Sequence, residues 1–112
     1  MTWTAWQYRD VYDSAYAGAD NDTQDVMTRR LDYLLEHGNM TQRPISAPLR
    51  DGILEFRAKK VRILFFFSPD KRIIFVVGIV KDQRTVPDAA IEQAIKIRQQ
   101  IEGGIEVPIA VN

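Results

Sequence analysis

Three strand-like segments follow one another between residues 53 and 80, and they limit the possible folds more than any other feature. Apolar and polar side chains alternate over residues 53–59, and apolar side chains dominate residues 61–68 and 72–80. The connections are too short for a crossover, so consecutive strands must pair antiparallel. The almost unbroken apolar character of residues 72–80 indicates a central strand that is covered on both faces.

The segment before this meander predicts one more strand and two helices. Residues 3–8 alternate as a strand does, and residues 11–19 have the spacing of a short helix. A second helix is predicted over residues 23–37, because its apolar side chains recur at helical spacing. Asp22 can cap its start, and Gly38 is typical of a helix end.

The remaining segments complete an α+β pattern. Two prolines make residues 39–51 a predicted loop, and a Pro-Asp pair opens a predicted helix over residues 88–102. The tail, residues 103–112, is expected either to add an edge strand or to be disordered. We therefore expect a single domain over residues 1–112, with an antiparallel sheet of about four strands and two to three packed helices.

Composition excludes several kinds of site. The chain has no cysteine and one histidine, which rules out disulfides and thiolate metal sites and argues against a zinc centre or a serine–histidine–aspartate triad. We expect neither a metal nor a cofactor. No segment resembles a signal peptide or is long and apolar enough to span a membrane, so we expect a cytoplasmic protein.

The net charge of zero conceals an uneven distribution. Residues 1–40 carry three basic and seven acidic side chains, whereas residues 41–101 carry twelve basic and six acidic ones. A basic block of this kind can meet a polyanion even in a neutral protein. Charge alone favours an ordinary solvated surface, and nucleic-acid binding stays open as the second interpretation.

Basic side chains gather on and beside the three central strands. They are Arg57, Lys59, Lys60, Arg62, Lys81 and Arg84. Strand alternation predicts that Arg57 and Lys59 share a face, where they could hold a phosphate backbone beside the phenylalanines of residues 65–67. The competing interpretation places these phenylalanines in the core and pairs Arg57 with Glu55.

The order and spacing of several segments resemble a known family. Residues 49–57 read LRDGILEFR, residues 61–67 read VRILFFF, and residues 73–81 read IIFVVGIVK. Residues 85–87, TVP, then open the last predicted helix, and the connector from residue 34 to residue 44 ends on a proline. Together these motifs resemble the phage-derived, HigB-like branch of the RelE/ParE toxin superfamily over about residues 23–102.

The resemblance implies a RelE-like fold and the toxin of a type II toxin–antitoxin pair, an endoribonuclease that cuts mRNA without a metal, often on the ribosome. The RNA would supply its own 2′-hydroxyl as nucleophile, and arginine would stabilise the charge on the phosphorane. By motif position, the implied catalytic residues are Arg57, Arg62, Lys81 and Glu55. The implied RNA-binding residues are Lys59, Lys60 and Arg84.

The chain also departs from the family pattern. Asp82 replaces a second lysine, Val61 replaces a tyrosine, and Val77 replaces a histidine. These changes and the neutral charge favour an alternative: a protein of this fold that inhibits a protein target, as the ParE-like branch acts on gyrase, or an inactive prophage remnant. In either case the implied partner is a helix-turn-helix antitoxin that covers the basic face, and a homodimer stays open.

Overall fold

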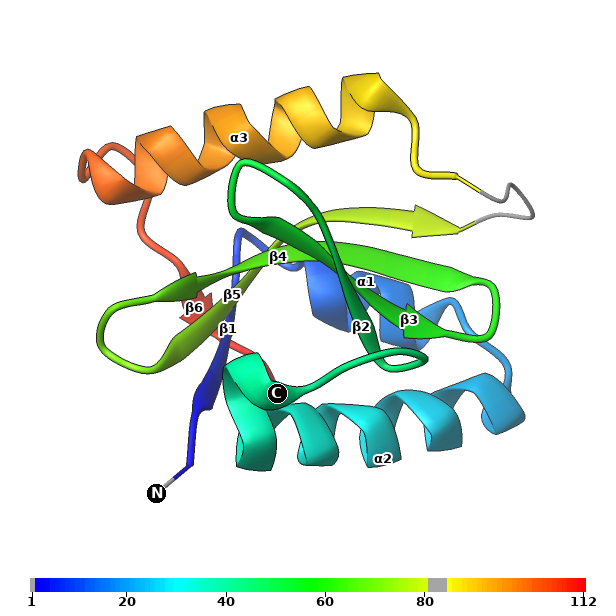
Figure 1. The fold of residues 1–112 in the computed structure, drawn as a ribbon. Coiled ribbons are helices and arrows are strands. Elements are labelled where there is room, and N and C mark those ends of the chain that lie inside the picture. Colours follow the sequence, from blue (N-terminus) through cyan, green and yellow to red (C-terminus); the bar gives the residue numbers. More distant parts are fainter. Residues whose placement is uncertain (1, 81–84) are drawn as a thin grey trace.

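A computed structural model describes residues 2–80 and 85–112 of the chain (Figure 1). The helices and strands, in chain order, are β1 (Thr4–Gln7), α1 (Val11–Ala17), α2 (Asn21–His37), the 3₁₀ turn η1 (Gly38–Met40), β2 (Ser46–Arg50), β3 (Ile53–Ala58), β4 (Val61–Ser68), β5 (Arg72–Val80), α3 (Asp88–Glu102) and β6 (Ile109–Ala110).

The strands form one mixed sheet in the order β2–β3–β4–β5–β1–β6. The three central strands pair antiparallel as predicted, and β5 lies inside the sheet between β4 and β1. β1, however, runs parallel to β5, which it can do because the intervening helices and strands bring the chain back to the same end. The α+β class is confirmed. The described residues nevertheless form six strands with one parallel pair, where about four antiparallel strands were predicted.

The strand β2 lies inside the segment that was predicted to be a loop. It pairs antiparallel with β3 through a two-residue turn at Asp51 and Gly52. Both turn residues have positive φ, 54° and 78°, as a type I′ hairpin turn requires. The prediction was wrong because Pro48 does not prevent an edge strand, where one missing N–H donor is tolerated.

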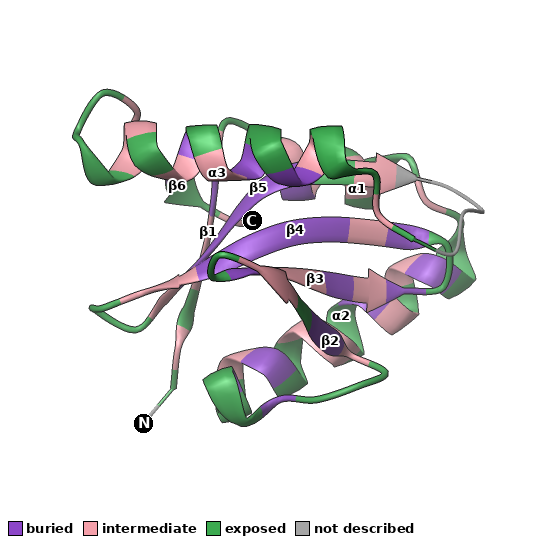
Figure 2. Ribbon diagram, turned by 45° about the horizontal axis from the view of Figure 1, so that its top comes forward, coloured by how far each residue is buried: buried purple, intermediate pink, exposed green. Residues whose placement is uncertain are grey.

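The helices cover both faces of the sheet (Figure 2). One face packs against α1 and α2, and its buried side chains include Phe56, Phe65 and Phe75. The other face packs against α3 and includes Leu64 and Phe66. Successive side chains of a strand point to opposite faces, so the consecutive phenylalanines of β4 belong to two different cores. Phe65 and Phe66 are therefore too buried to stack a base, and the partly buried Phe67 packs against Trp3 and Phe65.

The helix α2 begins two residues earlier than predicted. Asp20, rather than Asp22, caps it by accepting a 2.8 Å hydrogen bond from the Thr23 amide. Hydrogen bonding from the side chain and the backbone amide of Thr23 lowers the pKa of the Asp20 carboxyl. The predicted end at Gly38 is confirmed, as are the short helix α1 and the bounds of α3.

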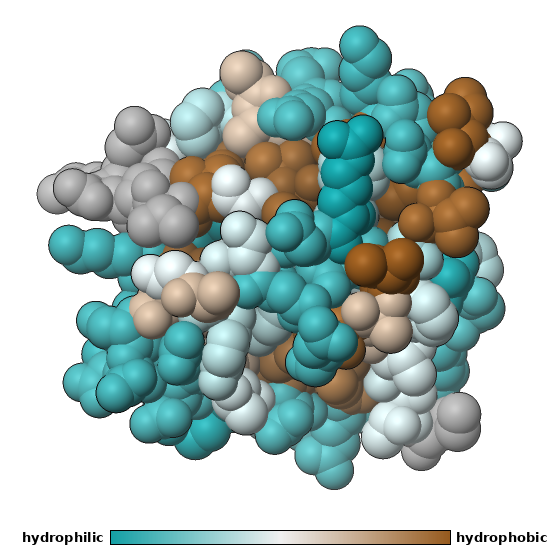
Figure 3. Space-filling view, turned by 180° about the vertical axis from the view of Figure 1, so that it is seen from behind, coloured by the Kyte–Doolittle hydropathy of each residue, from teal (hydrophilic) through white to brown (hydrophobic). Residues whose placement is uncertain are grey.

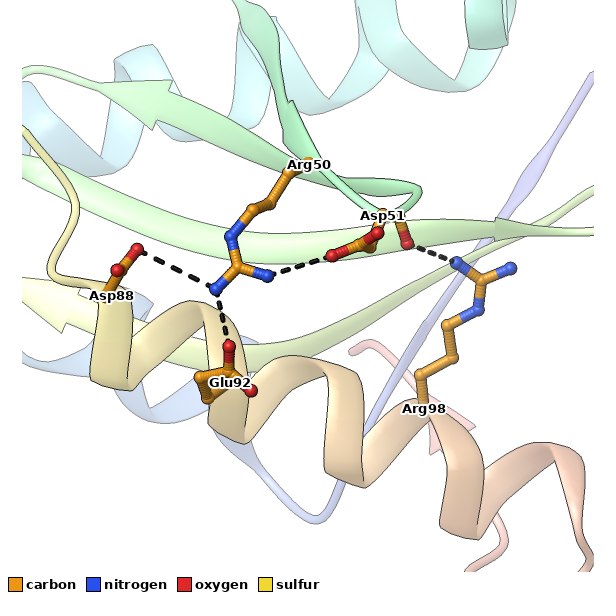
Figure 4. Close-up of polar contacts among 5 residues, drawn as sticks. All are labelled: Arg50, Asp51, Asp88, Glu92 and Arg98. Carbon is orange, nitrogen blue, oxygen red and sulfur yellow. Dashed lines mark hydrogen bonds and ion pairs between the residues drawn. The ribbon is translucent and has the colours of Figure 1, made fainter.

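Two arginines hold α3 against the β2–β3 turn (Figure 4). The Arg50 guanidinium lies 2.9 Å from Asp51, 2.6 Å from Glu92 and 3.7 Å from Asp88. Arg98 donates to the Asp51 carbonyl oxygen at 3.2 Å, and its guanidinium lies 5.0 Å from the centre of the Phe66 ring. Exposed pairs contribute little energy individually. Together they connect two parts of α3, at Asp88–Glu92 and at Arg98, to the same turn.

A buried glutamine joins β1, α1 and the C-terminal strand. The Gln7 side chain is fully buried, and its oxygen accepts from the amides of Tyr12 and Asp13. Its nitrogen donates to the Asp13 carboxylate at 2.7 Å and to the Ala110 carbonyl at 3.2 Å. Gln7 therefore caps the start of α1 from outside the helix. It also holds β6, so the tail forms the edge strand that was one of its two predicted states.

Replacing this glutamine should weaken the fold. We expect Gln7→Ala to lower the free energy of unfolding by about 2–4 kcal/mol, because it leaves buried polar groups without partners. Urea unfolding followed by circular dichroism measures the change. Gln24→Ala is the matched control, since the Gln24 side chain donates an exposed hydrogen bond to the Tyr16 carbonyl. Equal losses in the two variants would contradict a special role for Gln7.

Candidate functional site

Arg57 and Arg62 face each other across the β3–β4 hairpin. They are direct register partners, and Arg62 is in turn opposite Ile79 on β5. Directly opposed side chains of an antiparallel pair emerge on the same face, with Cβ atoms about 5 Å apart. The two arginines that the sequence singled out thus lie side by side on the face that also carries α3.

Glu55 pairs with Arg62. Its carboxylate lies 3.4 Å from the Arg62 guanidinium, and both side chains are largely buried, with 13% and 18% of their surface exposed. Arg62 also donates to the carbonyl oxygens of Val61 and Lys59. The predicted pairing of Glu55 with Arg57 is therefore wrong. The longer diagonal contact across the strands is within reach of an arginine side chain.

A third arginine, Arg30 of α2, reaches the same region from the other face. It donates a 3.1 Å hydrogen bond to the Arg57 carbonyl oxygen. Sequence reasoning missed Arg30, because nothing in a helix rich in charged residues indicates which side chain will reach the sheet. We call Arg30, Arg57, Arg62 and Glu55 the arginine cluster.

Positive charge exceeds negative charge in the arginine cluster. Burial lowers the pKa of Arg62, the guanidinium groups of Arg57 and Arg30 lower it further, and the Glu55 carboxylate opposes them. Arginine stays protonated in spite of such shifts. The Arg57 guanidinium has neither an ion pair nor a hydrogen bond to any other described residue. The arrangement can therefore accept an anion, and the fork of a guanidinium matches phosphate oxygens.

The other predicted basic residues lie apart from the arginine cluster. Lys59 does not share the face of Arg57, because β3 ends at Ala58 and Lys59 occupies the turn with a φ of 55°. Its ammonium group lies 3.8 Å from Asp22 of α2, in an exposed and therefore weak pair. Lys60 is exposed in the same turn. The last two predicted residues, Lys81 and Arg84, lie outside the described residues.

The cavities formed by described residues lie away from the two central arginines. Three surface cavities of about 460–550 Å³ are formed by described residues, and none of the three is lined by Arg57 or Arg62. Within residues 2–80 and 85–112, no three His, Cys, Asp or Glu side chains are grouped so that they could hold a metal ion. No helix in these ranges has the length and apolar character needed to cross a membrane.

Comparison with protein families matches residues 17–99 to the family described as phage derived protein Gp49-like (DUF891). The chain belongs to this Gp49-like family. The match covers α2, all three strands of the meander and most of α3, so the arginine cluster lies entirely within the family region. The N-terminal strand and the tail that pairs with it lie outside that region.

Other comparisons add little to the Gp49-like assignment. No curated protein matches the chain. Among solved structures, the chain is similar to a chain of the toxin–antitoxin complex RelBE2 from Mycobacterium tuberculosis, with 16% sequence identity and a TM-score of 0.39. That similarity covers 72% of this chain and all of the other.

Proposed function

We propose that this protein is the toxin of a toxin–antitoxin pair and that it cuts mRNA. Its arginine cluster would bind the phosphate backbone of the RNA. The observation that carries the proposal is the direct opposition of Arg57 and Arg62 on adjacent strands. The motifs that resemble the HigB-like branch of the RelE/ParE superfamily supply the reaction type. Membership of a phage-derived family agrees with that resemblance.

The proposed reaction needs little from the protein. The RNA 2′-hydroxyl attacks the neighbouring phosphorus to form a 2′,3′-cyclic phosphate. The bond from phosphorus to the 5′-oxygen of the next nucleotide breaks, and that oxygen takes a proton from water. Arg57, which has no described partner, and Arg62, which is fixed by Glu55, would stabilise the charge that grows on the phosphorane oxygens. Glu55 would accept the proton of the attacking hydroxyl once RNA displaces its contact with Arg62. Lys81, Arg84, Lys59 and Lys60 remain proposed contacts of the RNA, and action on the ribosome remains part of the proposal.

A second function deserves a test because neither Arg57 nor Arg62 lines any of the three cavities described above. A protein that inhibits a protein target, such as gyrase, could use the same basic face without catalysis. An inactive prophage remnant would do neither. For both active alternatives we propose a helix-turn-helix antitoxin as the partner that covers this face, and its coexpression should relieve growth arrest.

Arg57→Ala should separate activity from stability. We expect about a 10²- to 10³-fold loss of RNA cleavage, the usual cost of removing one donor to a developing oxyanion. Stability should change by less than about 1 kcal/mol, because the substitution also removes repulsion from Arg62. Cleavage is measured with purified protein and RNA in the presence of EDTA, and in cells by primer extension.

Arg29→Ala is the matched control, because Arg29 is an exposed arginine of α2. It should leave cleavage unchanged. Growth arrest without discrete cuts would overturn the nuclease proposal and support the inhibitor of a protein target. The absence of both arrest and cuts would support the inactive remnant.

A further inference from the structure

A cavity of about 460 Å³ lies between α1 and α3 at the edge of β5. β1 ends at Gln7, opposite Phe75, whereas β5 continues to Val80. Beyond Gln7 the sheet edge is therefore flanked by Val11 of α1 and Gln93 of α3, both of which line the cavity. In Figure 3, which shows the molecule from behind, apolar side chains reach the surface below α3. We call this space the α1–α3 cavity.

The rim of the α1–α3 cavity carries a planar cationic surface. The Arg9 guanidinium lies 4.8 Å from the centre of the Tyr8 ring, and both residues line the cavity. Arg9 has a φ of 53°, an uncommon conformation for a residue other than glycine. Aromatic rings and guanidinium planes are the surfaces on which proteins stack unpaired bases.

The rest of the lining suits a flat, polar-edged ligand. Val76 and Val77 give an apolar floor, and Asp10, Ser14 and Gln93 are exposed around it. The side chains of these three polar residues make no hydrogen bond to another described residue. They present a carboxylate, a hydroxyl and an amide, the donors and acceptors that read the edges of a base. The volume lies within the range of small-molecule sites.

Strand register connects the α1–α3 cavity to the arginine cluster. Val77 on its floor, Leu64 and Glu55 form one cross-strand row, and Ile79, Arg62 and Arg57 form the next row on the same face. Neighbouring strands lie about 4.8 Å apart. Arg62 is therefore one strand, and Arg57 two strands, from the strand that bounds the cavity. Leu64 and Val77 of the first row are buried under α3, whereas Ile79 and Arg62 of the next row are partly exposed, so an RNA segment that joins the two places would follow this second row.

We propose that the α1–α3 cavity binds one base of a single-stranded RNA whose phosphate lies at the arginine cluster. The inference rests on the proposed function, since it assigns the base-recognition part of the same substrate site. The free edge of β5 could instead accept a peptide strand, as exposed sheet edges do. The polar groups and the Tyr8–Arg9 surface favour the base, because a peptide strand would pair with the backbone.

Nucleotide titration tests the cavity independently of cleavage. The four nucleoside 5′-monophosphates, at millimolar concentration, should shift the backbone amide NMR signals of Tyr8, Gly78 and Gln93. Ser14→Trp should abolish these shifts, because the indole fills the space. Ala17→Trp is the matched control on the same helix, at an exposed residue that does not line the cavity, and it should leave them intact. Absence of shifts in the wild-type protein would overturn the inference, and so would a response to peptides alone.

Cleavage kinetics then distinguish the two proposals. We expect Ser14→Trp and Tyr8→Ala to raise the KM for RNA about fivefold to a hundredfold, the usual loss for one stacked base, with little change in kcat. Arg57→Ala should instead lower kcat. If the wild-type protein cuts no RNA yet its cavity residues still respond to nucleotides, the nuclease proposal fails and the base site stands. An unchanged KM in both cavity variants of an active enzyme would overturn the base site alone.

Discussion

Gly38→Ala is expected to lower the free energy of unfolding by about 2–6 kcal/mol, from backbone strain and overpacking together. Gly38 ends α2 with φ 55° and ψ −128°, a region that side chains other than glycine rarely adopt. A Cβ atom at this position would also overlap the indole of Trp3. Trp3 cannot move aside easily, because its amide donates to the Leu35 carbonyl and its ring packs edge-on against Phe67 at 4.9 Å.

Gly18→Ala provides the control for this experiment. Gly18 ends α1 with an ordinary helical φ of −83°, and a Cβ there would make only ordinary contacts at 3.5 Å or more. We expect urea unfolding to show a neutral or slightly stabilised Gly18→Ala protein. Adding Trp3→Ala to Gly38→Ala separates the two causes, since it removes the overlap and leaves the strain. A Gly38→Ala protein as stable as wild type would contradict the described end of α2.

Phe75→Ala should lower the free energy of unfolding by about 3–5 kcal/mol, the usual loss when a buried phenylalanine is truncated. Phe75 is fully buried on β5, and its ring centre lies 4.9 Å from that of Tyr12, 5.6 Å from Phe65 and 5.7 Å from Phe56. These rings join α1 to three strands. The cavity left by the substitution would therefore open where the helix layer meets the sheet, between the rings of Tyr12, Phe56 and Phe65.

Tyr33→Ala is the control for the loss of an aromatic side chain. Tyr33 is 45% exposed on α2 and stacks on His37 at the surface. We expect its loss to change stability by less than about 1 kcal/mol. Denaturant unfolding of both variants decides the comparison. A small loss in Phe75→Ala would mean that the core of the α1 and α2 face is not packed as described.

The meander could be predicted because its signals are local. Alternation, apolar runs and short turns fixed three strands and their pairing, and these determine that Arg57 opposes Arg62. Asp51-Gly52 was also a readable hairpin signal, and using it would have placed β2 before β3. The prediction of a loop rested on the prolines of the preceding segment alone, although an edge strand tolerates them.

Other features could not be read from local pattern. Whether β1 runs parallel or antiparallel to β5 depends on how the helices return the chain, and no residue of β1 encodes it. The contact of Arg30 with β3 and the pairing of Glu55 with Arg62 depend on which side chains meet after packing. The left-handed conformation of Lys59 similarly turned that side chain away from the predicted face.

The parallel pairing of β1 has a consequence for synthesis in the cell. Residues 4–7 are synthesised well before their partners, residues 72–75, and residues 109–110 complete that edge later still. Such distant pairings form slowly, because the chain must lose the entropy of closing a long loop before the stabilising contacts form. A nascent or prematurely terminated chain that lacks residues 72–75 would therefore hold an unfinished sheet.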